Sequence, residues 1–423
     1  MNSLNTKIYS NIIWQFFPSV LRIGISFVGT MYVANQMTKT DFGTFQYLTS
    51  YFYIFLMFEH LTHSNILKEY FLESGTDDTS RLFSSIFISM IFCFLALMIS
   101  MFWFRESQEW YLWSFFMIAL FFRSFSPISY YFDSLLLSKY GSTSQLIGSL
   151  SFNLIRLLNP ISLTFQCAVF SLQFVIVSII NIFTFKAKIN NFKHIKLPSF
   201  SIVKNIFVKS FPLFISVLLV QLTQRVDVFI LKSYLSFEDV ADYSVAVKFA
   251  EPWMFLASSV VVSVFPKLIS INKNDMQLVN ISYNFVNKVL MIMGALIATV
   301  TLLLSAPVLE FVFDQKYNES IKLLNLYILS TPFLFLNLVQ QIWEQKNEYL
   351  YFSVLRLCIG LFSNILLNIF LIPKYGTEGA VYATLISYSF FSVFSNLLTK
   401  KSRKYLLIQL SFLRLDKYKI FFK

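Results

Sequence analysis

Long apolar runs recur along the whole chain and are separated by short polar segments. The run from Leu82 to Phe104, LFSSIFISMIFCFLALMISMFWF, is representative. About 20 consecutive apolar residues cross a bilayer core as an α-helix, whereas the strands of a membrane β-barrel read as short alternating segments. The pattern predicts an all-α polytopic membrane protein. Its twelve or so transmembrane helices are expected at residues 12–34, 42–61, 82–104, 110–131, 142–160, 163–185, 210–233, 243–265, 284–306, 321–342, 350–372 and 377–399.

A basic segment divides the predicted helices into two groups of six. Residues 186–209 carry six lysines and no long apolar run. A faint internal similarity supports the division, because Phe-Pro opens both the first span, at Phe17, and the seventh, at Phe211. We expect an N-terminal six-helix bundle at 1–185, a linker at 186–209, a C-terminal six-helix bundle at 210–399 and a basic tail at 400–423. The tail alternates basic with apolar residues, which leaves two alternatives open: an interfacial amphipathic segment or a disordered one.

The distribution of charge supports a membrane protein and gives its orientation. Charged residues make up 13% of the chain, against about 25% in soluble domains. One set of inter-helix segments, with both ends of the chain, holds 21 Lys and Arg residues, and the opposite loops hold six. Since cytoplasmic loops carry the excess of positive charge, both termini and the linker are expected to be cytoplasmic.

Several charged side chains fall inside the apolar spans. Such groups are costly at bilayer depth and normally face a cavity or a partner. The cations outnumber the carboxylates, so water or an anionic ligand is expected to neutralise the remainder. Arginine suits this task because its planar fork binds phosphate oxygens in pairs. The candidate anion-binding residues are Arg22, Arg123, Arg156, Arg225, Arg356 and Lys248, and the carboxylates are Asp227 and Glu251.

Polar residues recur at helical spacing in two of the spans. Spacings of three and four residues place such side chains on one face of a helix. We therefore expect each stripe to face a cavity. Lys248 and Glu251 in the eighth span are three residues apart, which fits either a structural ion pair or a role in transport. The two stripes are Gln15, Ser19, Arg22, Ser26 and Thr30, and Gln145, Ser149, Asn153 and Arg156.

The sequence lacks the motifs of the common enzyme and ATP-binding classes. It contains no GxxxxGK[ST] phosphate loop, no HExxH and no GxSxG. Its three cysteines lie in apolar runs without His at ligand spacing, which favours neither a disulfide nor a zinc site. We expect a secondary transporter with no cofactor or metal and no nucleic-acid partner. Pro18, Pro127, Pro252 and Pro332 lie within spans and predict kinks.

Several stretches resemble one family over nearly the whole chain. They are TKTDFGTFQYLTSY, FPLFISVLLVQLTQRVDVFIL, ADYSVAVKFAEPWMFLASSVVVSVFPKL, VLEFVFDQKYNESIKLLNLYIL and NIFLIPKYGTEGAVYATLISY, and the IPKYGTEGA junction is the most specific. They are similar to the O-antigen and capsule flippases of the Wzx family. That family belongs to the multidrug/oligosaccharidyl-lipid/polysaccharide (MOP) exporter superfamily. One departure is Asp242, where the family usually carries glycine; we expect it to alter a turn without changing the function.

The resemblance implies a MATE-like fold of two six-helix halves and an alternating-access flippase. Its substrate would be an undecaprenyl-pyrophosphate-linked oligosaccharide, moved from the cytoplasmic to the periplasmic leaflet of the bacterial inner membrane. Asp227 and Glu251 are the candidates for coupling to H⁺ or Na⁺. Membrane lipids, and the polymerase and chain-length regulator of the same pathway, are the expected partners.

Two other functions are weighed against the flippase. A multidrug exporter of the same superfamily is expected to line its cavity with carboxylates, the opposite sign to that found here. An O-antigen polymerase usually carries a long periplasmic loop with catalytic residues. The longest outside loop predicted here, at about 310–322, has only a dozen or so residues. Both alternatives are therefore less consistent with the sequence than a flippase.

Overall fold

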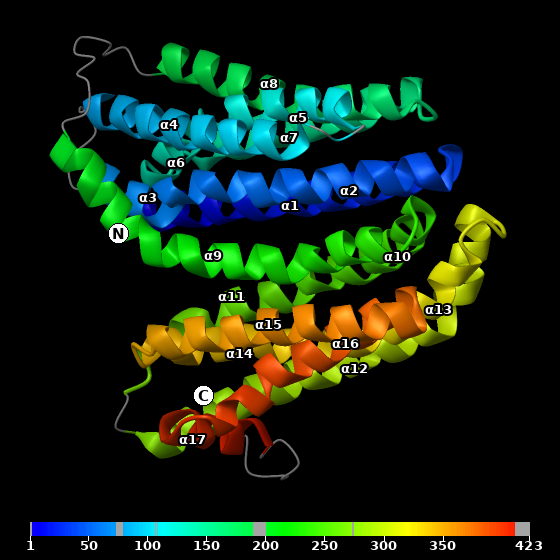
Figure 1. Ribbon diagram of the computed structural model, residues 1–423. Helices are drawn as coiled ribbons and strands as arrows, with labels where there is room; N and C mark the ends of the chain where they lie inside the picture. The colour runs from blue at the N-terminus through cyan, green and yellow to red at the C-terminus, as the bar shows by residue number, and fades with distance from the viewer. Residues whose placement is uncertain are drawn as a thin grey trace. The chain divides into compact units, whose positions relative to one another are not determined.

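The structure, a computed structural model, describes residues 2–72, 79–105, 107, 109–188, 200–272 and 275–410. All regular secondary structure in these residues is helical (Figure 1). The first eight α-helices are α1 (Asn2–Gln36), α2 (Lys39–Leu56), α3 (Ser64–Leu72), α4 (Thr79–Phe104), α5 (Trp110–Arg123), α6 (Pro127–Ser134), α7 (Ser138–Ile155) and α8 (Leu163–Lys188). The next five are α9 (Phe200–Tyr234), α10 (Phe237–Ala250), α11 (Met254–Ser270), α12 (Met276–Phe313) and α13 (Asn318–Tyr327). The last four are α14 (Thr331–Lys346), α15 (Leu350–Tyr375), α16 (Thr377–Ser392) and α17 (Lys400–Leu410).

Short 3₁₀ helices interrupt or end several of these elements. They are η1 (Met57–Thr62), η2 (Arg156–Leu158), η3 (Glu251–Trp253), η4 (Ile328–Ser330) and η5 (Phe394–Leu397). Breaks occur at three of the four prolines predicted to kink a span, whereas Pro18 lies inside α1, which continues through it. Pro127 begins α6, Pro252 lies in η3 and Pro332 lies in the first turn of α14. Proline is tolerated in the first helical turn, where its missing N–H has no partner to lose.

Ten helical segments of the described chain are long and apolar enough to cross a membrane. They match ten of the twelve predicted spans. The other two predicted spans, 42–61 and 142–160, contain α2 and α7, which form as helices but carry more polar residues. Large apolar side chains stand exposed, such as Phe311 at 91% and Phe102 at 78%. Exposed apolar surface of this kind is expected where lipid, and not water, surrounds the helices. The chain is a multi-pass membrane protein.

The chain divides into two compact units, Met1–Gln221 and Leu222–Lys423. The division lies inside α9, later than the linker predicted at 186–209. The reason is that Ile206, in the first half of α9, belongs to a buried cluster of the first unit with Leu67, Phe71 and Phe185. Residues 189–199 of the predicted linker lie outside the described residues.

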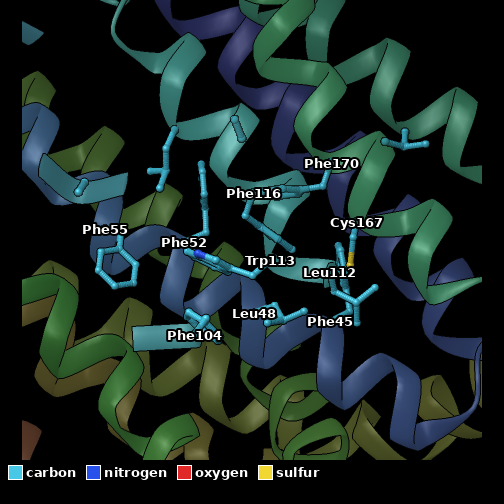
Figure 2. Close-up of a cluster of buried hydrophobic side chains, with 14 of the residues drawn as sticks. Phe45, Leu48, Phe52, Phe55, Phe104, Leu112, Trp113, Phe116, Cys167 and Phe170 are labelled. Atoms are coloured by element: carbon cyan, nitrogen blue, oxygen red, sulfur yellow. The ribbon is translucent and has the colours of Figure 1, made fainter. Parts of the chain in front are cut away.

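An aromatic core holds the first unit together (Figure 2). Trp113 of α5 is fully buried and stacks on Phe104 and Phe116, with ring centroids 4.5 and 5.3 Å away. Phe52 of α2 meets Phe170 of α8 edge-on at 5.1 Å. Aromatic pairs in these geometries contribute roughly 0.5–1.5 kcal/mol each beyond their buried area. The cluster fixes α2, α4, α5 and α8 relative to one another.

In the second unit, α15 and α16 form a tight antiparallel hairpin that packs beside α14 (Figure 1). The IPKYGTEGA motif makes the turn. Gly376 has φ +58°, a conformation that favours glycine. Gly379 lies against the backbone of Leu371 and Ile372, so a Cβ at this position would collide with α15. The most specific sequence motif is therefore a close helix crossing.

The structure of the second unit tests two further expectations, one for Asp242 and one for the C-terminal tail. Asp242 lies within α10 and alters no turn, so that expectation was wrong; Ser320 donates to its carboxylate at 3.1 Å. The first part of the tail is helix α17, whose Tyr405 is fully buried and packs on Trp343 at 4.9 Å. Residues 400–410 are thus neither disordered nor wholly exposed. The rest of the tail lies outside the described residues.

Candidate functional site

The two predicted polar stripes face each other across the contact of α1 with α7. Gln15 donates to Ser138 at 2.8 Å, and Ser26 and Ser149 lie 3.3 Å apart. Further along, the Nη1 of Arg156 donates to Thr30 at 3.3 Å. The stripes therefore form a polar seam between two helices, and only part of that seam opens into a cavity.

That cavity lies inside the first unit and has a volume of about 430 Å³. Arg22 enters it from α1 and Arg123 from the end of α5. Gln145 accepts a hydrogen bond from the Nη1 of Arg22. The wall combines two guanidinium groups, amides, hydroxyls and aromatic rings: Arg22, Ile23, Ser26, Tyr53, Leu56, Arg123, Gln145, Ser149, Gln173, Phe174 and Val177. No carboxylate of the described residues lines it. Of the six cations proposed from the sequence as anion-binding residues, Arg22 and Arg123 are the two in this lining.

Arg123 has a carboxylate partner behind the cavity wall. Its Nε and Nη2 donate to the two oxygens of Glu59 at 2.8 and 2.9 Å, and Tyr130 donates to the same carboxylate at 2.9 Å. The Glu59 side chain is 1% exposed and that of Arg123 is 25% exposed. The guanidinium thus has one edge on a buried carboxylate and the rest toward the cavity.

Arg156 lies deeper on the same seam and is 1% exposed. Its Nε donates to the amide oxygen of Gln166 at 3.2 Å, and its guanidinium covers the ring of Phe152 at 4.6 Å. Its Nη2 meets no hydrogen-bond partner among the described residues. Arg156 is not among the residues that line the 430 Å³ cavity.

Arg356, in the second unit, is fully enclosed. Its Nε and Nη2 donate to the two oxygens of Glu344 at 2.8 and 3.1 Å, and its Nη1 donates to Asn337 at 2.6 Å. The two ionised side chains are 0% and 1% exposed. A neutralised, saturated guanidinium is poorly suited to receive a ligand, so this geometry favours a structural role for Arg356.

The two remaining cation candidates also lie in the second unit. The Nζ of Lys248 lies 3.7 Å from the Oε2 of Glu251, with the side chains 29% and 35% exposed. The i,i+3 ion pair proposed from the spacing therefore forms, immediately before the break at η3. Arg225 is half-buried in α9.

Asp227 of α9 sits in a cluster of neutral donors from three other helices. Its Oδ2 accepts from Tyr243 of α10 at 2.6 Å and from Thr384 of α16 at 2.8 Å. Its Oδ1 accepts from Asn368 of α15 at 2.7 Å, and Asn368 in turn donates to the Oδ1 of Asn364 at 3.1 Å. Asp227 is 3% exposed and pairs with no cation in the described part of the chain. Oxygen atoms of Asp227, Asn364 and Thr384 could together hold H⁺ or a small hard cation.

Two residues essential to these arrangements were missed or undervalued from the sequence. Glu344 lies two residues beyond the predicted span 321–342, and Glu59 lies two residues before the end of the predicted span 42–61. A carboxylate at either position is expected to reach water, so neither was matched with an in-span arginine. A search for one carboxylate per in-span arginine, extended one helical turn past each span, would have found both.

Comparisons with known proteins agree with this fold. A model of the family described as "Polysaccharide biosynthesis protein" matches residues 8–272. No curated protein sequence gives a match. The lipid II flippase MurJ, in an inward closed conformation, superposes with a TM-score of 0.72 at 16% identity, over 95% of this chain and 91% of that one.

Transporters of the MATE family share the fold as well. An inward-facing multidrug resistance MATE transporter of the MOP superfamily gives a TM-score of 0.64 at 13% identity, over 93% of this chain and 99% of that one. A mutant of the Vibrio cholerae MATE transporter VcmN gives 0.60 at 14% identity, over 97% and 99% of the two chains. The MATE-like fold expected from the motifs is thereby confirmed. The chain belongs to the polysaccharide biosynthesis protein family.

Proposed function

We propose that this protein is a flippase for an undecaprenyl-pyrophosphate-linked oligosaccharide, an O-antigen or capsule repeat unit. It moves the headgroup from the cytoplasmic to the periplasmic leaflet of the bacterial inner membrane, with both of its own termini in the cytoplasm. The supporting observation is the 430 Å³ cavity, which exposes Arg22 and Arg123 and whose lining, in the described part of the chain, contains no carboxylate. Its volume is within the range of about 300–1,000 Å³ that is usual for small-molecule sites.

The chemistry of the wall fits a diphosphate joined to a sugar. Guanidinium groups bind phosphate oxygens through charge-assisted hydrogen bonds. Gln145, Gln173 and Ser149 offer neutral donors and acceptors of the kind that sugar hydroxyls require, and Tyr53 and Phe174 add ring faces. A cationic drug would meet two positive charges here, which disfavours the multidrug alternative.

The six cationic candidates differ in their fitness for this role. Arg22 and Arg123 lead because they line the cavity. Arg225 and Lys248 remain proposed headgroup contacts of the second unit. Arg156 and Arg356 are buried in side-chain networks and rank last, as groups that would reach a ligand only after a rearrangement.

We further propose that Asp227 couples transport to an ion gradient. A buried carboxylate that receives only neutral hydrogen bonds can exchange between a protonated form and one that binds Na⁺. Glu251 is the weaker candidate, because Lys248 already neutralises it at 3.7 Å. The polymerase and the chain-length regulator of the pathway remain proposed partners.

The test is complementation of a flippase-deficient strain, with surface polysaccharide as the readout. Arg22→Gln should abolish the polymer at normal protein level, because the amide cannot bind phosphate as an ion. Lys322→Gln, which removes an equal charge from a side chain that is 62% exposed outside the cavity, is the matched control and should complement fully. Full complementation by Arg22→Gln would contradict the proposed substrate site.

A further inference from the structure

The buried pair of Glu59 and Arg123 has a role that the proposed flippase site does not use. Arg123 belongs both to the cavity wall and to an ion pair behind it. Its Nε and Nη2 are occupied by Glu59, whereas its Nη1 has no partner among the described residues. A guanidinium binds an oxyanion most strongly through two parallel N–H groups. Glu59 therefore occupies one of the two-donor edges that a phosphate would use.

The surroundings of Glu59 make it the resident anion of this site. Arg22 and Arg123 bring two positive charges to the cavity, and Glu59 brings the one negative charge that balances half of them. Tyr130 donates a further hydrogen bond to Glu59 at 2.9 Å. An incoming phosphate that binds the Nε and Nη2 of Arg123 in place of Glu59 would leave the Glu59 carboxylate buried and unpaired, which is strongly unfavourable. A proton on Glu59 removes that cost.

The carboxylate lies in a short connection between two helices. Glu59 belongs to η1, the 3₁₀ stretch that follows α2 and ends before His63, whose backbone is extended where α3 is about to begin. Stretches of 3₁₀ helix are common at helix C-termini and in connections. Apart from the ion pair, η1 is tied to α4 by the hydrogen bond between Thr62 and Ser89, at 2.7 Å.

The other titratable groups around Glu59 are few. Burial, with smaller contributions from His60 and Lys68, lowers the pKa of His63 to about 4, which leaves this imidazole neutral near pH 7. Lys68 is paired with Asp133 at 2.8 Å. The groups that face Glu59 from the surrounding elements are Arg123 of α5, Tyr130 of α6, Cys93 of α4 and His60 of η1 itself.

We propose that Glu59 is a proton-binding site coupled to anion binding: an anionic headgroup displaces Glu59 from Arg123, and the released carboxylate takes a proton from water. This inference rests on the proposed function, because it assumes that the cavity binds a phosphate. It adds a coupling site in the first unit, separate from Asp227 of the second. Arg22 and Arg123 keep their charges, and only Glu59 changes protonation state.

The experiment measures binding of inorganic pyrophosphate to the purified full-length protein in detergent by titration calorimetry. Two buffers with different ionisation heats give the number of protons taken up per anion bound. Wild-type protein should take up more protons than Glu59→Gln, and the difference isolates Glu59 because pyrophosphate's own titration is common to both. Glu59→Gln should also bind about tenfold more tightly, within the usual range for coupled sites. Equal affinity and equal proton uptake in the two proteins would overturn the inference.

Two further variants keep the test decisive. Tyr130→Phe removes one hydrogen bond to Glu59 without changing charge, so it should ease protonation and tighten pyrophosphate binding at neutral pH. If Glu59→Gln does not fold, Tyr130→Phe carries the test, and unchanged binding would overturn the inference. Arg22→Gln distinguishes the two proposals. If it binds pyrophosphate as wild type does, the cavity is not the anion site and the proposed function fails. If it binds weakly while Glu59→Gln matches wild type, only the proton site fails.

Discussion

Variants of the buried Arg356–Glu344 pair distinguish most clearly between an arginine with a structural role and one that binds the ligand. Replacing Arg356 by Met removes both hydrogen bonds to Glu344, at 2.8 and 3.1 Å, and leaves a carboxylate that is 1% exposed. Gln340, at 3.0 Å, is then the side-chain donor that remains to it. Removing one partner of a buried ion pair costs about 3–5 kcal/mol. With so little residual solvation, we expect the upper half of that range for Arg356→Met.

The double variant Arg356→Met with Glu344→Gln sharpens the test. It removes both charges, so the penalty of an unpaired buried ion disappears. We expect it to be more stable than the sum of the two single changes predicts, by about 1–3 kcal/mol, the usual coupling between side chains in contact. The remaining loss comes from the hydrogen bond to Asn337, at 2.6 Å.

The assay is unfolding of the purified protein by a denaturing detergent, followed by tryptophan fluorescence, with Arg22→Gln as the matched control. The control should unfold like wild type because Arg22 borders an open cavity. Two results would refute the reasoning: additive losses in the double variant, or an Arg356→Met protein of normal stability that no longer binds pyrophosphate. The second would establish Arg356 as a ligand contact, as its position in the sequence suggested.

Other changes test other parts of the structure. Asp227→Asn should remove the dependence of transport on a Na⁺ gradient in proteoliposomes held at constant pH, while leaving pyrophosphate binding intact; persistence of the Na⁺ dependence would exclude this residue as the Na⁺-coupling site. Gly379→Ala should lower unfolding stability by about 1–3 kcal/mol, as overpacking does, and an unchanged unfolding midpoint would contradict the close helix crossing. Tyr405→Ala empties a fully buried site on α17 and should lower the free energy of unfolding by about 3–5 kcal/mol, as truncation of other large aromatic side chains does. Unchanged stability would show that the packing of α17 contributes little to the fold. Arg156→Met should leave stability within about 1 kcal/mol of wild type, since it removes a buried charge without orphaning a carboxylate, and a loss of transport at full stability would restore Arg156 as a headgroup contact.

Local features of the fold were readable from the sequence. Apolar runs and prolines depend on neighbours within a few turns, so the spans and the breaks before Pro127, Pro252 and Pro332 emerge from periodicity alone. The polar stripes were also found by spacing. What spacing could not supply was the partner: the stripe of α1 meets the stripe of α7, whose residues lie 123 positions later in the chain, as the contact between Ser26 and Ser149 shows.

Charge pairing was the part of the site that the sequence could not predict. Glu59 and Arg123 are 64 residues apart, and the packing of η1, α5 and α6 brings them together. Counting in-span carboxylates suggested that the arginines lack partners. Two of the five in-span arginines, Arg123 and Arg356, pair with a buried carboxylate once the helices are packed. Those carboxylates, Glu59 and Glu344, lie at or just past the ends of spans defined by hydropathy. Hydropathy alone treats a residue at the end of a span as exposed to water, and in both cases the structure buries it.

The partners of each arginine decide which of them can receive an anion. The carboxylate on Arg356 cannot leave without exposing a buried charge, so an incoming anion gains little there. The amide on Arg22 is neutral, and an anion that replaces Gln145 gains a full ionic interaction while the amide finds another hydrogen bond in the polar cavity. Arg123 lies between these extremes, because its carboxylate can be released only with a proton. The order of binding follows: a phosphate engages Arg22 first, and its transfer onto Arg123 is the step that carries the proton dependence.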